Sequence, residues 1–215
     1  GAFPIGMLQL LVKVYSRIEP RFDTYKAKFN VLQNNIYGVD IEPMAIEISR
    51  LRAWLALVVE EDGDRAKVKP LPNLDFKFVC ANSLVELDDS TQVSLFDDHD
   101  LDEKLQGLRS EYFATQSLVK KSKLKEKYSS MVDGELTPFQ ESRRSGQLKS
   151  FKPFDSESTA SFFDPIQMFG VESFEIVIGN PPYVSTKGRD ASTKSSLMLD
   201  FGFADDLYSH FYFKG

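Results

Sequence analysis

The stretch Asn180-Pro181-Pro182-Tyr183 has the residue types and order that suit chemistry on a weakly nucleophilic amino group. The side-chain oxygen of Asn180 and the backbone oxygen of Pro181 are neighbouring hydrogen-bond acceptors, and the two prolines make the turn that presents them stiff. Such acceptors stabilise positive charge as it forms on a planar nitrogen bonded to a ring or carbonyl carbon. The ring of Tyr183 offers a flat surface on which a heteroaromatic ring can stack.

Three predicted strands end in polar residues, and this turn follows one of them. Residues 174–179 are almost continuously apolar, which predicts a strand buried on both faces, as in a parallel sheet. A short strand over 36–39 ends at Asp40 before a helix that begins at Pro43, and a strand within 74–84 ends at Asn82 and Ser83. Ligands of parallel α/β sheets bind at the carboxyl ends of the strands, so these three tips are the candidate site.

Two of the tips have a structural explanation as well as a functional one. Asp40 could accept both hydroxyls of a ribose, or it could be stabilised by the dipole of the helix that follows. Asn82 and Ser83 could read the edge of an adenine ring, or they could form a turn, in which both residue types are common. The residues alone leave both readings open.

Five stretches together resemble the catalytic domain of an adenine-specific DNA methyltransferase. The resemblance is to the type found in restriction–modification enzymes that fuse methylation and cleavage in one chain. NPPY at 180–183 matches the family's catalytic motif, YGVDIEPMAIEISRLRAWL at 37–55 its acidic second motif, and CANSL at 80–84 its third. GAFPIGML at 1–8 is similar to the trailing half of the first motif, and DDLYSHF at 205–211 to a segment after the catalytic turn.

The resemblance implies the fold class and the reaction. It implies an α/β chain with a Rossmann-like, S-adenosylmethionine-dependent methyltransferase core, incomplete here, that carries an α-helical insertion. Residues 1–84 and 174–215 would belong to the core, and residues 85–173 would be the insertion. The reaction would move a methyl group from S-adenosylmethionine to the exocyclic amino group of an adenine flipped out of double-stranded DNA.

The resemblance also implies residue roles. It assigns seven residues to the cofactor: Gly1, Ala2, Phe3, Asp40, Ile41, Asn82 and Ser83. The first three would border the amino acid moiety, Asp40 would accept the ribose hydroxyls, and the others would surround the adenine. The catalytic turn would be Asn180, Pro181, Pro182 and Tyr183, and DNA would contact Tyr183, Lys187 and Arg189.

Helical patterns occupy much of the remaining chain. Met7, Leu10, Leu11, Val14, Tyr15 and Ile18 share a predicted helical face, as do Ile48, Leu51, Leu55 and Val58. Residues 20–34 are predicted to be a polar connection. Residues 101–131 are predicted to form one long helix or a helical hairpin, with its lysines either in solvent or on DNA phosphates: Lys120, Lys121, Lys123, Lys125 and Lys127. Residues 150–165 are predicted to be a loop.

Composition narrows the classes of function. A net charge of -6 argues against a self-sufficient nucleic-acid binder, although a catalytic module can be acidic. The single Cys80 excludes an internal disulfide and favours the cytoplasm.

No apolar run reaches the ~20 residues of a membrane span. His99 and His210 stand apart, so we expect no metal site, and Mg²⁺ would serve only a nuclease domain outside this chain.

The missing head of the first motif leads us to expect a middle piece of a longer protein. Such a piece would neither bind S-adenosylmethionine tightly nor methylate DNA alone, and target-recognition and nuclease domains would lie outside it. Two other functions fit the same turn. One is methylation of a protein glutamine or an RNA base, whose amino groups pose the same chemical problem. The other is a non-catalytic DNA-binding or scaffolding subunit.

Overall fold

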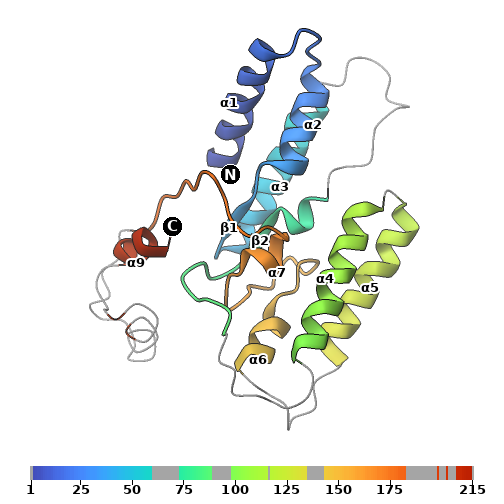
Figure 1. Ribbon diagram of the computed structural model, residues 1–215, viewed down its shortest axis with the longest axis vertical. Coiled ribbons are helices and arrows are strands. Elements are labelled where there is room, and N and C mark those ends of the chain that lie inside the picture. The colour runs from blue at the N-terminus through green and yellow to red at the C-terminus, as the bar shows by residue number, and fades with distance from the viewer. Residues whose placement is uncertain are drawn as a thin grey trace.

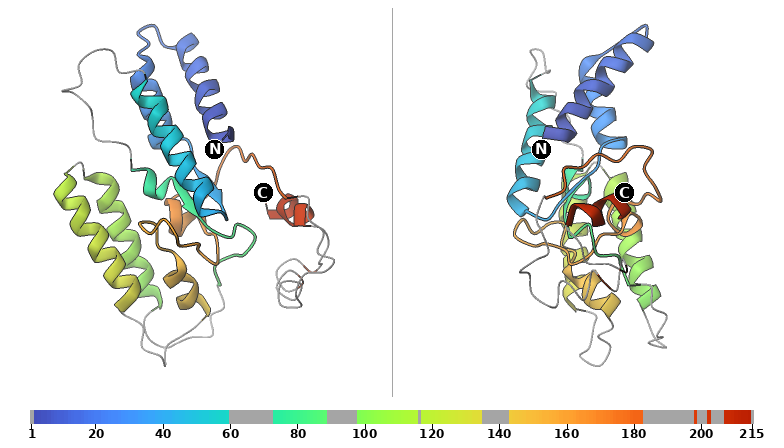
Figure 2. Two further views of the ribbon diagram at one scale, coloured as in Figure 1. Left: turned by 180° about the vertical axis from the view of Figure 1, so that it is seen from behind. Right: turned by 90° about the vertical axis from the view of Figure 1, so that its left-hand side faces the viewer.

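A computed structural model describes residues 2–59, 73–88, 98–115, 117–134, 143–182, 198, 202 and 207–214 (Figure 1). In chain order its elements are α1 (Ala2–Ile18), α2 (Thr24–Asn34), β1 (Gly38–Asp40), α3 (Pro43–Val58), η2 (Leu74–Phe76), β2 (Phe78–Cys80), α4 (Asp98–Ala114), α5 (Leu118–Gly134), α6 (Arg143–Ser150), α7 (Pro165–Phe169) and α9 (Leu207–Lys214). Helices α1 to α3 lie at one end of the molecule and α4 to α6 at the other, with the strands between them (Figures 1 and 2).

β1 and β2 form a parallel pair, as the sequence predicted. Gly38 is opposite Phe78, and Asp40 is opposite Cys80. A Cβ on Gly38 would lie 2.7 Å from the buried Phe78 ring, so a larger residue there would force this ring to move. The described residues therefore form an α/β structure with a small parallel sheet whose strand tips lie at one edge.

The predicted polar connection over 20–34 is wrong, because residues 24–34 form helix α2. Asp23 caps this helix by accepting a hydrogen bond from the Lys26 N–H at 3.0 Å. Ala27 and Val31, spaced four residues apart, are buried against α1 and α3. The cap and this spacing were the signals in the sequence that the prediction overlooked.

The predicted buried faces of α1 and α3 are also wrong. In α1, Leu8 and Val12 are buried, whereas Ile18 is 70% exposed. In α3, Ile46 and Ala53 are among the buried residues. The residues expected on the buried faces are largely exposed: Leu10, Val14, Tyr15, Ile48, Leu51, Leu55 and Val58. Both helices carry apolar side chains on two faces, so the largest residues did not indicate which face packs.

The predicted helical hairpin is confirmed by α4 and α5, which lie antiparallel beside the strands (Figure 2). Their buried residues share one cluster with Phe76 and Val79 of the η2–β2 segment. The ring of Phe76 lies 5.6 Å from that of Tyr112 and 5.8 Å from that of Tyr128, measured between centroids. The domain boundaries at residues 85 and 173 stay predictions, and the helices between them pack directly on β2.

The buried strand predicted over 174–179 is wrong for the described structure. The segment belongs to no strand, and Ile176 and Val177 are 68% and 63% exposed. It begins beside β1, where the Phe174 ring lies 5.5 Å from the Tyr37 ring. No described strand pairs with this segment or with the second edge of β1. Without such a neighbour, the apolar side chains have no surface against which to be buried.

Candidate functional site

The tip of β1 presents the Asp40 carboxylate. The backbone oxygen of Asp40 accepts the Ala81 N–H at 2.9 Å, which fixes the tip against β2. Its Oδ1 accepts the Glu42 N–H at 3.0 Å, and no described residue bonds to its Oδ2. Oδ1 therefore stabilises the backbone just before α3, and Oδ2 remains an exposed hydrogen-bond acceptor. That acceptor suits a hydroxyl group, such as one of a ribose.

The tip of β2 lies beside Asp40 and carries Asn82. Asn82 Oδ1 accepts the Leu84 N–H at 3.2 Å, which closes the local turn that the sequence left as one alternative. Its backbone N–H donates to the Ala160 oxygen at 2.9 Å. No described residue bonds to the Nδ2 group, so this half of the amide is available as a donor. Asn82 and Ser83 are half-buried, which leaves their edges open to a ligand.

Ile41 and Cys80 complete this edge. Ile41 is 60% exposed, and its carbonyl accepts the Cys80 S–H at 3.4 Å. Burial raises the pKa of the Cys80 thiol, and the charges of Asp40 and Glu42 raise it further. Cys80 therefore remains a neutral thiol at physiological pH, which argues against a nucleophilic role. Ile41 is free to form an apolar wall beside a ligand.

The third predicted tip is only partly described. Asn180 and Pro182 are exposed and Pro181 is half-buried, whereas Tyr183, Lys187 and Arg189 lie outside the described residues. Within the described residues, no hydrogen bond joins Asn180 to Asp40 or Asn82. The structure therefore pairs the tips at Asp40 and Asn82, and no hydrogen bond joins the described part of the third tip to them.

The predicted cofactor residues of the first motif lie at the start of α1. Ala2 and Phe3 are exposed, and Gly1 is outside the described residues. The segment that includes 174–182 passes close to this end of α1 in each view (Figures 1 and 2). The beginning of α1 and the approach to the predicted catalytic turn are thus neighbours (Figures 1 and 2).

A comparison with protein families identifies the chain. The family described as Eco57I restriction-modification methylase matches residues 34–215, a span that contains both strand tips and the Asn180 turn. The chain belongs to the Eco57I restriction–modification methylase family. The resemblance inferred from the motifs is therefore confirmed at the level of the family.

One relative of this Eco57I-family chain is a protein of Methanocaldococcus jannaschii. Its name includes "type II restriction enzyme and methyltransferase RM.MjaORFECS2P". The two are 41% identical over 81 residues, which are 37% of this chain and 7% of the relative. The chain thus spans a small part of the length of the relative. No solved structure matches the chain.

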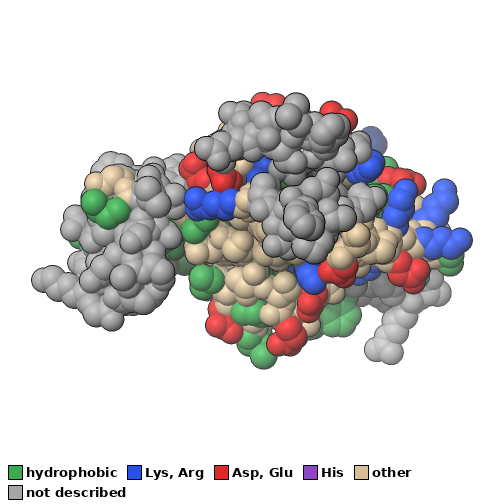
Figure 3. Space-filling model, turned by 90° about the horizontal axis from the view of Figure 1, so that it is seen from below, with side chains coloured by type: hydrophobic (Ala, Val, Ile, Leu, Met, Phe, Trp, Pro, Cys, Tyr) green, Lys and Arg blue, Asp and Glu red, His purple; other side chains and the backbone are tan. Residues whose placement is uncertain are grey.

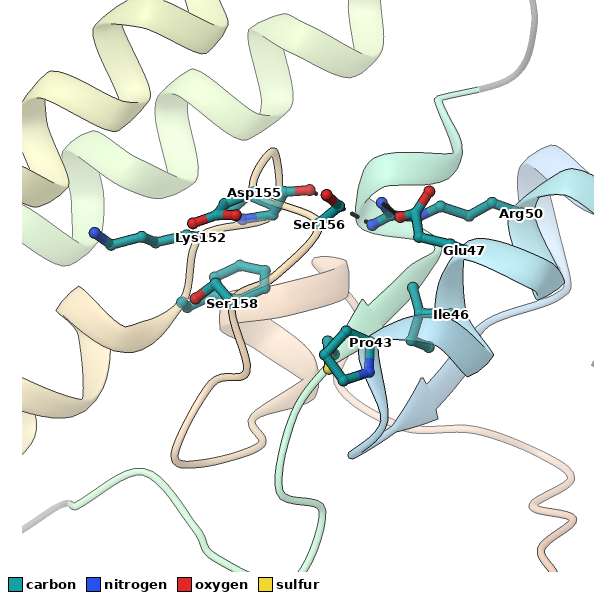
Figure 4. A pocket seen from close by; sticks show the side chains of 11 residues that line it. Pro43, Ile46, Glu47, Arg50, Lys152, Asp155, Ser156 and Ser158 are labelled. Atoms are coloured by element: carbon teal, nitrogen blue, oxygen red, sulfur yellow. Dashed lines mark hydrogen bonds and ion pairs between the residues drawn. The ribbon is translucent and has the colours of Figure 1, made fainter.

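Arg50 is a residue near the site that the sequence analysis did not single out. Its Nη2 donates to the Phe78 oxygen at 2.7 Å and to the Asp75 oxygen at 3.0 Å, and its Nη1 contacts Glu47 at 2.8 Å. Figure 4 shows Arg50 and Pro43 in a pocket that Ser158 lines from the other side. Arg50 thereby ties α3 to the start of β2. An arginine inside the apolar pattern of 46–58 was the signal for such a bond.

The lysines of α5 divide into two groups. Lys120, Lys123 and Lys127 are exposed, and Figure 3 shows Lys and Arg side chains gathered at the end of the molecule where α5 lies. Lys125, expected on the solvent side, instead lies 3.2 Å from Asp75 Oδ2 and 4.8 Å from the centre of the Phe154 ring. Lys121 is also half-buried, with its Nζ 5.7 Å from the Tyr112 ring centre. DNA contact by the exposed lysines stays a prediction.

Two absences hold for the described part of the chain. None of its helices combines the length and apolar character that a membrane span needs. It also contains no cluster of three His, Cys, Asp or Glu side chains arranged to bind a metal ion.

Proposed function

We propose that this chain is part of a restriction–modification enzyme that methylates the exocyclic amino group of adenine in DNA, with S-adenosylmethionine as donor. The observation that carries the proposal is the parallel register of β1 and β2. It sets the exposed carboxylate of Asp40 beside Asn82 in a chain of the Eco57I methylase family. A complete Rossmann-like core would contain this strand pair, whose parallel direction supports that fold.

The two strand tips fit S-adenosylmethionine by their donor and acceptor chemistry. Asp40 Oδ2 can accept ribose hydroxyls, and Asn82 Nδ2 can donate to a ring nitrogen of adenine. Ile41 can pack against the ring, and Ala2 and Phe3, with Gly1, would border the amino acid moiety. When bound, S-adenosylmethionine supplies an electrophilic methyl group on a sulfonium centre.

The catalytic turn would act on the target amino group. Asn180 Oδ1 and the Pro181 oxygen would accept its two N–H bonds and stabilise the positive charge that develops on nitrogen. Pro182 would keep these acceptors rigid, and Tyr183 would stack on the flipped base. The exposure of Asn180 supports a role toward an external group, because its amide is not committed to the packed interior. Positioning then supplies most of the catalysis.

The proposed partners follow from this chemistry. Double-stranded DNA is the substrate, and Lys187 and Arg189 would contact it beside the catalytic turn. Other domains of the protein would recognise the target sequence. A nuclease domain, where present, would use Mg²⁺. The cytoplasm is the proposed compartment, because DNA and S-adenosylmethionine meet there.

Product analysis tests the proposed function. The intact protein is incubated with S-adenosylmethionine carrying a trideuterated methyl group, together with DNA, RNA and protein substrates. We expect the label in N6-methyladenine of digested DNA. Label in glutamine or in RNA would instead support the second enzymatic function. No labelled product from any substrate, DNA containing the enzyme's own target sequence included, would favour the non-catalytic subunit.

A further inference from the structure

The chain that returns from the insertion is hydrogen-bonded along the edge of β2 at the tip that carries Asn82. Ala160 and Ala81 form an isolated parallel bridge, and each is 1% exposed. The Ala160 N–H donates to the Cys80 oxygen, and the Ala160 oxygen accepts the Asn82 N–H, both at 2.9 Å. Residues 158–161, here called the strap, therefore extend the sheet beside the tip.

Two more contacts hold the tip on either side of Asn82. Thr159 Oγ1 lies 3.3 Å from Cys80 Sγ, and the Phe163 N–H donates to the Val85 oxygen at 2.8 Å. The backbone from 80 to 85 is thus held at both ends and in its middle. Because the strap binds the backbone of Asn82, it shapes the turn while leaving the Nδ2 group available.

The strap is in turn fixed by Ser150, the last residue of α6. The Ser150 hydroxyl oxygen accepts the Ser161 N–H at 2.9 Å, and the Ser150 carbonyl accepts the Ser158 hydroxyl at 3.3 Å. The same Ser150 hydroxyl donates to the Gln147 carbonyl at 2.6 Å. α6 is anchored in the core through Leu148, which is 4% exposed. Packing of the insertion is therefore transmitted to the tip through a short series of bonds.

The strap and the loop that leads into it also face the other tip. Figure 4 shows Ser158 and Asp155 across a pocket from Pro43, the first residue of the helix after Asp40. Cys80, the residue opposite Asp40 in the sheet, lines the same pocket. The insertion thus borders the candidate site and does not only cover the far side of the sheet.

We propose that the strap is a positioning element of the cofactor site, which sets the conformation of Asn82 and Ser83 and thereby the affinity for S-adenosylmethionine. The inference rests on the proposed function. Without the strap, the Asn82 N–H and the Cys80 carbonyl would lie on an open sheet edge, and the turn could adopt other conformations. Binding would then have to order the turn, at a cost in affinity that the preformed turn avoids.

Ser150→Ala in the intact protein tests the inference, because it removes the hydroxyl that holds Ser161 and leaves the tip residues unchanged. We expect the Kd for S-adenosylmethionine, measured by calorimetry well below the unfolding midpoint, to rise about fivefold, as for the loss of one hydrogen bond. The KM for S-adenosylmethionine should rise with kcat unchanged, and DNA affinity should stay within about twofold. Ser150→Thr keeps the hydroxyl and should restore the parent Kd.

Ser130→Ala on α5 is the matched control, because its hydroxyl donates to the Lys127 carbonyl at 3.0 Å within its own helix. Its Kd should equal that of the parent. Ala160→Pro removes the N–H that binds the Cys80 oxygen and should raise the Kd at least about tenfold. If that variant does not fold, Ser150→Ala decides alone.

Two results would overturn the inference, and they are distinguishable. A folded Ser150→Ala protein with the Kd of the parent, even with a lower Tm, would show that the strap has a purely structural role. A parent protein that neither binds S-adenosylmethionine nor transfers methyl groups would refute the proposed function, and the inference with it.

Discussion

The two oxygens of the Asp40 carboxylate have different roles, one in the fold and one in the candidate site. One oxygen accepts the Glu42 N–H at 3.0 Å, and the other has no partner among the described residues. We expect Asp40→Ala in the intact protein to weaken S-adenosylmethionine binding by about 10- to 100-fold, because hydrogen bonds to a charged acceptor are lost. Equilibrium binding measures the change. Asp133→Ala, which removes an exposed carboxylate paired with Lys152 on the insertion, is the control and should leave the affinity unchanged. Equal affinities for both variants would contradict this role.

Lys77 is a buried cation at the start of β2. It is 5% exposed, and its Nζ lies 3.7 Å above the centre of the Tyr37 ring, with no ion pair among the described residues. Burial lowers the pKa of Lys77 to about 8 from 10.5. Between these values the unfolded chain binds more protons than the folded one, so this residue makes stability rise with pH from about 8 to 10.5.

Lys77→Met should remove this contribution to the pH dependence of stability. Below pH 8 the lysine is charged in both states and its full desolvation cost is present, partly offset by the Tyr37 ring. We therefore expect the variant to be more stable at pH 7 by about 1–3 kcal/mol, with the gain shrinking toward pH 10.5. Denaturant unfolding at several pH values measures it. Lys123→Met, at an exposed site on α5, should show neither effect. An unchanged pH slope in Lys77→Met would refute the assignment.

At the scale of the elements, α6 ties together the outgoing and returning chain of the predicted insertion, residues 85–173. The Gln147 amide is 6% exposed and bonds to the outgoing chain twice: its Nε2 donates to the Glu86 oxygen and its Oε1 accepts the Asp88 N–H, both at 2.8 Å. Gln147→Leu would remove both hydrogen bonds to these backbone groups. We expect it to lower the free energy of unfolding by about 2–4 kcal/mol.

Chemical denaturation measures the free energy of unfolding of Gln147→Leu and of a control, Gln33→Leu, at an exposed position of α2. The control should change stability by less than about 0.5 kcal/mol. A Gln147→Leu protein as stable as the control would show that these two hydrogen bonds do not stabilise the fold.

Several elements could be predicted from the sequence, for identifiable physical reasons. Pro43 fixed the start of α3, and the parallel pairing of β1 and β2 followed from apolar strands separated by a helix. The buried faces of α1 and α3 could not be predicted, because each helix is apolar on two sides. The burial of 174–179 depends on a neighbouring strand, which no local pattern specifies.

The candidate site was predictable in part. The rule that ligands bind at strand tips placed Asp40 beside Asn82, because a parallel register follows from the order of the elements. The bond between Asn82 and Ala160 could not be predicted, since it joins residues far apart in sequence through a one-residue bridge. Arg50 could be noticed as an arginine inside an apolar pattern, but its partners could not be predicted, because they are backbone carbonyls that no residue type identifies.

At the scale of the whole molecule, the η2–β2 segment lies between two hydrophobic clusters. Phe76 and Val79 face the cluster formed with α4 to α7, whereas Leu74 and Phe78 face the cluster of α1 to α3. Because side chains of this segment point to opposite sides, the segment packs against both clusters. The insertion and the N-terminal helices should therefore unfold as one unit.

Two probes can test this cooperativity. Trp54 is the single tryptophan and reports on the unfolding of α3, whereas far-UV circular dichroism is dominated by the helices of both clusters. We expect coincident transitions. Phe76→Ala, at a fully buried ring, should lower the free energy of unfolding by about 3–5 kcal/mol. Both transitions should therefore move to lower denaturant concentration. A shift confined to circular dichroism, with the Trp54 transition unmoved, would show that the insertion is an independent domain.

The central claim is that the Asn180 turn performs methyl transfer to adenine. Its most direct test is the single-turnover rate of N6-methyladenine formation by the intact protein with Asn180→Ala, at saturating S-adenosylmethionine and DNA. We predict a fall of at least about a hundredfold, because one of the two acceptors for the amino group is lost. Binding of S-adenosylmethionine should stay within about twofold of the parent. A rate close to that of the parent would contradict the account.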